Sequence, residues 1–226
     1  MTQAPEKVHL AAFDYDGTII DGNSPVLLVT QMAFKRMLRA KPLFGAAWFG
    51  IRYKFHLPQT EDHAREMVFT AFEGWPVAAA DKYLADFHDN KLQPIYRPQA
   101  LEAIQRHVSQ GDKVVLVSAT FEPIARRVME LYPFTHQIST SMKIDKHGLY
   151  TCEVDGECTE GQVKMDLLKQ WADETYGPDG WELTYAYADH HSDKPMLDAA
   201  VNAYAVTPGP TLERYAKKKG WDVLEW

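Results

Sequence analysis

Residues 10–19 read LAAFDYDGTI, so a run of small and apolar side chains leads directly into Asp14-Tyr15-Asp16-Gly17-Thr18. The run predicts a buried strand, and two acids at its carboxyl end are costly unless a cation lies between them. A turn at Gly17 lets the Asp14 carboxylate and Asp16 face one space. That space suits Mg2+, a hard ion that takes oxygen ligands, and Asp14 beside it is a candidate nucleophile. The alternative is an acidic turn whose aspartates cap a helix or face solvent.

A second apolar segment, KVVLVSAT at residues 113–120, predicts another buried strand that ends in hydroxyl side chains. A helix is expected to begin near Phe121, because Pro123 is tolerated in a first turn. Backbone N–H groups at that helix start, together with the Ser118 hydroxyl, would suit a phosphate group. The alternative is that Ser118 only caps the helix.

Two further segments place charged side chains beside predicted elements. Residues 158–164 read CTEGQVK and lead into an amphipathic helix expected to run to Glu174, with Lys164 in its first turn. A cation is unfavourable near a helix N-terminus, so Lys164 either has an anionic partner or faces solvent. Residues 183–188 predict a strand, and Asp189-His190-His191-Ser192-Asp193 follows it. The two histidines next to acids suggest either a transition-metal site or, the reading we favour, exposed or loop-packing side chains.

These four segments, in this order, resemble motifs I to IV of the haloacid dehalogenase-like (HAD) phosphohydrolase superfamily. The resemblance implies an Asp14 nucleophile, an Asp16 acid and base, and phosphate contacts from Ser118 and Lys164. It also implies Mg2+ held by Asp14, the Asp16 carbonyl and Asp189, with Asp193 orienting Lys164, and phosphate or substrate contacts from Thr18, Ala119 and Asn23. The sequence departs from the family where Ala188 and His190 flank Asp189, since Gly-Asp-Ser or Gly-Asp-Gly is usual there. Alanine does not take positive φ cheaply, so the sequence leaves the geometry of this loop open.

The long interval between the first two motifs predicts an inserted domain. Pro25 and Pro76 each open a helical pattern, and residues 61–72 are amphipathic. An insertion of this kind resembles a helical C1 cap. We therefore expect an α/β, Rossmann-like three-layer sandwich with a central, mostly parallel sheet, formed by residues 1–21 and 96–226, and an all-helical cap formed by residues 22–95. A hairpin is expected around residues 146–148, a strand at 203–206 and a helix at 212–218.

The resemblance extends to subfamily IB, whose best-known members are phosphoserine phosphatases. In those enzymes an acid after motif I holds the substrate ammonium, whereas Asn23 takes that position here, which disfavours phosphoserine. The prediction is a Mg2+-dependent phosphomonoester hydrolase that acts through an aspartyl-phosphate on a small phosphorylated metabolite. One alternative is a phosphatidylglycerophosphate-like lipid phosphatase, because the apolar segment PLFGAAWFGI at residues 42–51 has basic residues on both sides. A catalytically silent HAD-like binding or regulatory module is the alternative of another class.

Composition limits the partners and the compartment. A net charge of −7 over 226 residues provides no general basic surface, so nucleic acid is not expected as a partner. Cys152 and Cys158 form neither a disulfide framework nor a zinc spacing, and they suggest a reducing compartment. The polar start MTQAPEKVHL does not resemble a secretory signal, and no run of 18 apolar residues occurs. We expect a cytoplasmic protein with possible but not favoured membrane contact, and the sequence leaves its oligomeric state open.

Overall fold

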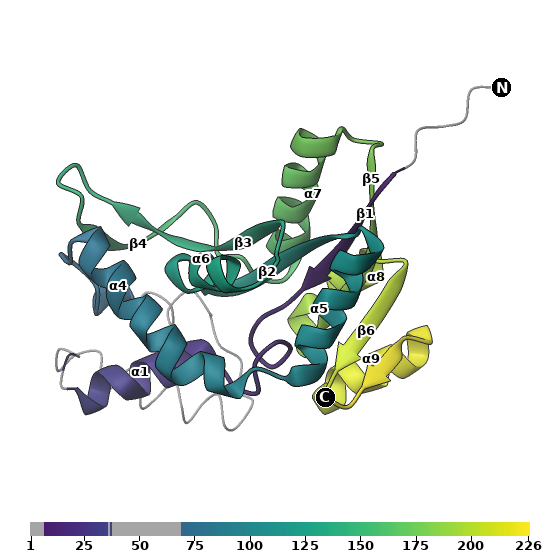
Figure 1. Ribbon diagram of the computed structural model, residues 1–226, viewed down its shortest axis with the longest axis horizontal. Coiled ribbons are helices and arrows are strands. Elements are labelled where there is room, and N and C mark those ends of the chain that lie inside the picture. The colour runs from purple at the N-terminus through teal and green to yellow at the C-terminus, as the bar shows by residue number, and fades with distance from the viewer. Residues whose placement is uncertain (1–6, 36, 38–68) are drawn as a thin grey trace.

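The computed structural model describes residues 7–35, 37 and 69–226. In these residues a seven-stranded sheet has the order β4-β3-β2-β1-β5-β6-β7, with helices packed against it (Figure 1). The strands are β1 (Val8–Phe13), β2 (Lys113–Phe121), β3 (His136–Ile144), β4 (Tyr150–Asp155), β5 (Trp181–Ala188), β6 (Asn202–Val206) and β7 (Asp222–Leu224). All neighbouring strands are parallel except β3 and β4, which are antiparallel. The predicted α/β sandwich with a mostly parallel sheet is confirmed.

Alternate residues of the central strand β1 belong to two separate cores. Ala11 and Phe13 pack in the core that also contains α5 (Pro98–Gln110) and α6 (Glu122–Leu131). Leu10 and Ala12 pack in the core that contains α7 (Gln162–Tyr176), α8 (Lys194–Ala199) and α9 (Pro210–Lys219). Because both faces are covered, β1 must be apolar along most of its length, as its sequence is.

The chain reverses its direction of travel across the sheet at β1. From β1 it moves outward through β2 to β3 and β4, then returns through α7 to β5, which pairs with the other edge of β1. In open parallel sheets such a switch point leaves a crevice at the carboxyl ends of the strands, where ligands bind. Asp14 follows β1, Asp189 follows β5, and Ser118 lies near the carboxyl end of β2, so all three are at that edge.

The described part of the insertion is helical. It contains α1 (Ser24–Phe34), α4 (Val77–Phe87), the π-helical turn η1 (His88–Leu92) and the short 3-10 helix η2 (Gln93–Ile95). Leu28 of α1 and Leu84 of α4 are buried in the same core as Phe13. The patterns after Pro25 and Pro76 are therefore confirmed as helices in their described residues. Residues 42–51 and most of 61–72 lie outside the described residues, and the division into core and cap stays a prediction.

The predicted hairpin at residues 146–148 is confirmed, and it contacts the insertion. Gly148 takes φ +77 in the turn between β3 and β4. Leu149 forms an isolated bridge with Pro76, just before α4, and the Tyr150 hydroxyl donates to Asp81 of α4 at 2.8 Å. Predicted boundaries shift by one to a few residues, since α6 begins at Glu122 and α7 spans more than the expected helix.

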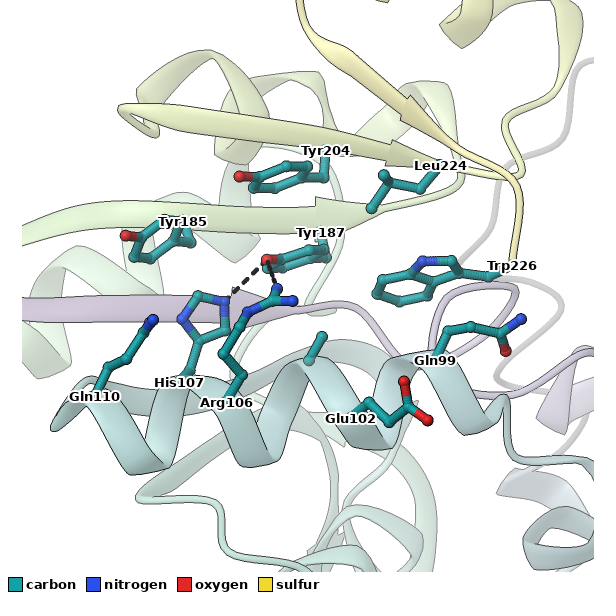
Figure 2. A pocket seen from close by; sticks show the side chains of 11 residues that line it. Gln99, Glu102, Arg106, His107, Gln110, Tyr185, Tyr187, Tyr204, Leu224 and Trp226 are labelled. Atoms are coloured by element: carbon teal, nitrogen blue, oxygen red, sulfur yellow. Dashed lines mark hydrogen bonds between the residues drawn. The ribbon is translucent and has the colours of Figure 1, made fainter.

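Aromatic rings cross the sheet directly beneath the first motif. Phe13, Tyr187 and Tyr204 are neighbours in register on β1, β5 and β6, and their rings stack with centroids 4.2 and 4.6 Å apart. A cavity of about 550 Å³ lies over this part of the sheet, between α5 and Trp226 (Figure 2). In the described part of the chain, no helix is long and apolar enough to cross a membrane.

Candidate active site

Asp14 and Asp16 lie in a tight turn that begins where β1 ends. The Asp14 N–H donates to the Tyr187 carbonyl at 2.9 Å, which keeps the backbone in line with the sheet. The Tyr15 carbonyl then accepts from the N–H groups of Ile19 and Ile20 at 2.9 and 3.1 Å, closing the turn. The Asp14 side chain is only 5% exposed. The sequence thus places a carboxylate in the interior, where it needs a counter-charge.

Lys164 supplies a positive charge beside Asp14. Its Nζ lies 2.7 Å from an oxygen of Asp14 and 2.7 Å from one of Asp193, and all three side chains are buried. Burial by itself would lower the pKa of Lys164, but the charges of Asp14 and Asp193 outweigh it and raise that pKa. The ammonium therefore stays charged in a buried site near the start of α7. A cation near a helix N-terminus requires an anionic partner, and Asp14 and Asp193 both provide one.

Three carboxylates gather at this edge of the sheet. One oxygen each from Asp14, Asp189 and Asp193 lies within 4.8 Å of the other two. Burial raises the pKa of Asp14 to about 6, and burial together with the charge of Asp14 raises that of Asp189 to about 8. An oxygen-rich, anionic cluster of this kind fits a hard divalent cation such as Mg2+, with Asp14 and Asp189 as its ligands and Asp193 held by Lys164.

Gly17 makes room for this cluster. It takes φ +72, and a Cβ atom built on it would lie 2.1 Å from an Asp189 carboxylate oxygen. The Asp189 side chain therefore rests directly on the glycine backbone. A glycine is required here by both the backbone conformation and the space.

The Asp16 carboxylate turns away from the other acids toward the start of α1. The Ser24 N–H donates to one oxygen at 2.5 Å and the Ser24 hydroxyl to the other at 3.0 Å. That hydroxyl also lies 2.8 Å from the hydroxyl of Thr120, near the end of β2. Burial raises the pKa of Asp16 to about 7, although the Ser24 N–H bond opposes the rise. The Asp16 side chain is therefore not part of the carboxylate cluster, and the metal contact of the Asp16 carbonyl stays a prediction.

The remaining residues predicted to contact phosphate or substrate are Ser118, Thr18, Ala119 and Asn23. The Ser118 hydroxyl is buried and accepts from the Thr120 N–H at 3.1 Å, and α6 has no side-chain cap, so Ser118 does not cap that helix. Thr18 Oγ1 is buried without a hydrogen-bond partner among the described residues. Ala119 is partly exposed beside Ser118. Asn23 caps α1, since its Oδ1 accepts from the Val26 N–H at 3.1 Å.

The fourth motif has an unusual sequence, but none of its residues takes a positive φ. Ala188 is the last residue of β5, and among the described non-glycine residues only Thr207 has a positive φ. Ala188 therefore does not take a positive φ, and the alanine fits this position. His190 and His191 are exposed and lie ring against ring, with centroids 4.1 Å apart, and neither belongs to the carboxylate cluster. This agrees with the preferred interpretation of the pair as exposed side chains.

Two hydroxyl residues at this site were not predicted. Nothing in the sequence near Ser24 or Thr120 indicates that they meet, since they are 96 residues apart. The one local signal was the Asn23-Ser24-Pro25 string, which is typical of a helix start and places Ser24 in the first turn.

The fold and this site define a phosphohydrolase of the α/β class, and comparison with known proteins identifies its family. Residues 11–198 match the family model for haloacid dehalogenase-like hydrolases, and the chain belongs to that family. The predicted family and the prediction of a phosphatase are both confirmed.

The chain aligns along most of its length with two relatives that are named as phosphatases. It is 30% identical to "Histidinol-phosphatase" of Neisseria meningitidis serogroup C (strain 8013), over 96% of this chain and 99% of that protein. It is 25% identical to "Phosphoserine phosphatase SerB1" of Mycobacterium tuberculosis, over 96% of this chain and 70% of that protein.

Solved structures share the fold. A protein of unknown function from Bordetella pertussis Tohama I superposes with a TM-score of 0.84 at 24% identity, over 97% of this chain and 99% of that one. A substrate-bound phosphoserine phosphatase superposes with a TM-score of 0.67 at 17% identity, over 99% of this chain and 95% of that one.

Proposed function

We propose that this phosphatase is a Mg2+-dependent hydrolase of small phosphomonoesters and that it acts through an aspartyl-phosphate on Asp14. The observation that carries the proposal is the position of Asp14. One of its oxygens is held by Lys164 at 2.7 Å, and it lies in the same cluster as Asp189. A second acid, Asp16, is held separately by Ser24. A nucleophile, a cation-binding cluster and an independent acid thus lie at one edge of the sheet.

In the first step an Asp14 oxygen forms a bond to phosphorus while the bond to the leaving alkoxide breaks. Asp16 gives its proton to that alkoxide. In the second step the ionised Asp16 takes a proton from water, whose oxygen attacks phosphorus and releases inorganic phosphate and the Asp14 carboxylate. Mg2+, when held by Asp14 and Asp189 with the Asp16 carbonyl, would supply positive charge to the phosphate oxygens.

The protein's own groups support both steps. A pKa of about 7 lets Asp16 carry a proton in one step and accept one in the next near neutral pH. We expect the buried Lys164 and the buried Ser118 hydroxyl to stabilise negative charge on the phosphate. Thr18, whose buried hydroxyl has no partner within the described residues, is a further candidate for this role.

The substrate is proposed to be a phosphorylated amino alcohol, with histidinol phosphate as the first compound to test. The support is the 30% identity to a histidinol-phosphatase over nearly the whole of both chains. Phosphoserine ranks below histidinol phosphate, because the relative named for phosphoserine is 25% identical over 96% of this chain. The lipid-phosphate alternative rests on residues 42–51, which lie outside the described residues. A cytoplasmic location stays part of this proposal.

The test is phosphate release from a panel of substrates, with Mg2+ and then with EDTA. The panel contains p-nitrophenyl phosphate, histidinol phosphate, phosphoserine, lysophosphatidic acid and phosphatidylglycerophosphate. We expect Mg2+-dependent turnover, highest kcat/KM on histidinol phosphate, and no turnover by Asp14→Asn. A folded wild-type protein that is inactive on every compound would support the silent-module alternative instead. Turnover by Asp14→Asn at the wild-type rate would show that the nucleophile is another residue.

A further inference from the structure

Five side chains form a continuous polar chain from the surface of α6 to the first motif. Arg127 donates to both oxygens of Asp89, at 3.0 and 2.7 Å. Asp89 lies 2.9 Å from His88 Nδ1, and His88 Nε2 lies 2.7 Å from the Tyr96 hydroxyl. The Tyr96 hydroxyl lies 3.2 Å from that of Tyr15, the residue between Asp14 and Asp16. The chain thus joins three segments that are far apart in sequence.

The chemistry of its members fixes the direction of every hydrogen bond in this chain. The ionised Asp89 only accepts, so His88 Nδ1 donates to it. Burial lowers the pKa of His88, which is then neutral, and Nε2 accepts from Tyr96. The Tyr96 oxygen is left to accept from the Tyr15 hydroxyl. Each donor has an acceptor, and the loss of Asp89 or Tyr96 leaves the fully buried His88 without a partner.

The location of the chain gives it a role beyond packing. Tyr96 lies in the segment that leaves the insertion, and this segment pairs with the one that enters it. The Arg97 N–H donates to the Ile19 carbonyl and the Asp21 N–H to the Ile95 carbonyl, each at 2.8 Å. His88, which is fully buried, begins the π-helical turn η1. Single π-helical turns are rare in proteins and frequently occur at functional sites.

We propose that His88 and Tyr96 are positioning residues for the phosphatase reaction. By holding the Tyr15 hydroxyl, they fix the backbone of the turn that carries Asp14 and Asp16. The Arg127–Asp89 ion pair holds His88 in turn, so that α6, which follows the Ser118 segment, and the first motif keep one relative position. This inference rests on the proposed function, because it assigns a role in the same active site.

Tyr96→Phe tests the centre of the chain. The variant keeps the ring but removes the hydroxyl that both Tyr15 and His88 use. We expect kcat on p-nitrophenyl phosphate to fall on the order of 10-fold with KM within about twofold, because a shift of a fraction of an ångström misplaces the nucleophile. Hydrogen exchange of the peptide that covers residues 13–21 should become faster. Tyr15→Phe should lower kcat similarly, and the double variant should be little worse than either single one.

Two adjacent arginines of α6 provide a test variant and its control at the end of the polar chain that is farthest from the first motif. Arg127 pairs with Asp89, which belongs to the chain, whereas Arg126 pairs with Asp81 and Glu122, which do not. Both arginines are partly exposed, and each binds an acidic residue of the insertion. Arg127→Met should lower kcat about threefold to fivefold and speed exchange in residues 13–21, since its ion pair is remote but coupled. Arg126→Met should leave both quantities unchanged.

The outcomes separate this inference from the proposed function. If the wild-type protein hydrolyses no substrate, the proposed function fails, and hydrogen exchange of residues 13–21 still decides whether the chain holds the turn. If Tyr96→Phe does not fold, the comparison of Arg127→Met with Arg126→Met carries the test. The inference is wrong if Tyr96→Phe keeps wild-type kcat and exchange, or if the two arginine variants behave alike.

Discussion

Replacing Gly17 by alanine tests whether the carboxylate cluster has the geometry that catalysis needs. The new Cβ would lie 2.1 Å from an Asp189 oxygen, so that oxygen must move by about 1.3 Å to reach the 3.4 Å of an ordinary contact. A misplacement of about 1 Å costs roughly 100-fold in rate, so we expect kcat/KM to fall at least about 100-fold, or roughly 2.7 kcal/mol. The φ of +72 adds a strain of about 1–2 kcal/mol to the folded state.

Gly148→Ala is the matched control for Gly17→Ala. Gly148 has φ +77, but nothing lies within 4 Å of a Cβ built on it. Both variants should lose about 1–2 kcal/mol of stability in urea unfolding, and only Gly17→Ala should lose activity and Mg2+ affinity. Activity on p-nitrophenyl phosphate and Mg2+ titration by calorimetry measure the difference. The reasoning is refuted if Gly17→Ala keeps activity within about threefold of wild type, or if Gly148→Ala loses as much.

Three further predictions follow from the buried polar groups. Ser24→Ala removes one bond to Asp16 and leaves the Thr120 hydroxyl unpaired. We therefore expect kcat to fall on the order of 10-fold and the free energy of unfolding to fall by about 1 kcal/mol. A changed KM with an unchanged kcat would contradict this prediction. Lys164→Met leaves buried carboxylates without their cation and should cost about 3–5 kcal/mol in urea unfolding with EDTA present, against little change for the exposed Lys82→Met. Burial lowers the pKa of His107, which bonds to Tyr187 in Figure 2, below the unfolded value of about 6.5, so its contribution is complete above that pH and is lost as the pH falls. The stability advantage of wild type over His107→Gln should therefore shrink between pH 7 and pH 5, and an advantage that grows would show that the sign is wrong.

Those parts of the fold that depend on local patterns could be predicted from the sequence. Apolar runs predicted β1, β2 and β5, and the polar residues directly after them had to meet because parallel strands end at one edge. Asp14, Ser118 and Asp189 therefore came from strand ends. Lys164 came from a helix start, where a cation needs an anion. In each case the argument needed only the type of element and the residue at its end.

Interactions that depend on distances between remote segments could not be predicted in this way. Ser24 meets Thr120 and Tyr15 meets Tyr96 across more than 80 residues, and hydroxyl residues are too common for their positions to indicate a partner. At Ala188 the strand continues without a positive φ, so no glycine is needed there. The side-chain oxygen of Asn23 caps the helix that it precedes, and its substrate contact stays a prediction.

The two segments that connect the insertion to the sheet both contact the first motif through side chains. Ser24, at the entry, bonds to Asp16, and Tyr96, at the exit, lies 3.2 Å from Tyr15. These contacts are buried or partly buried, so breaking one exposes a polar group to a less favourable environment unless water replaces its partner. A displacement of α1 from the end of β2 must therefore break the Ser24 bonds to Asp16 and Thr120 together. The Ser24 hydroxyl therefore contributes both to the free energy of that displacement and to the position of the Asp16 side chain.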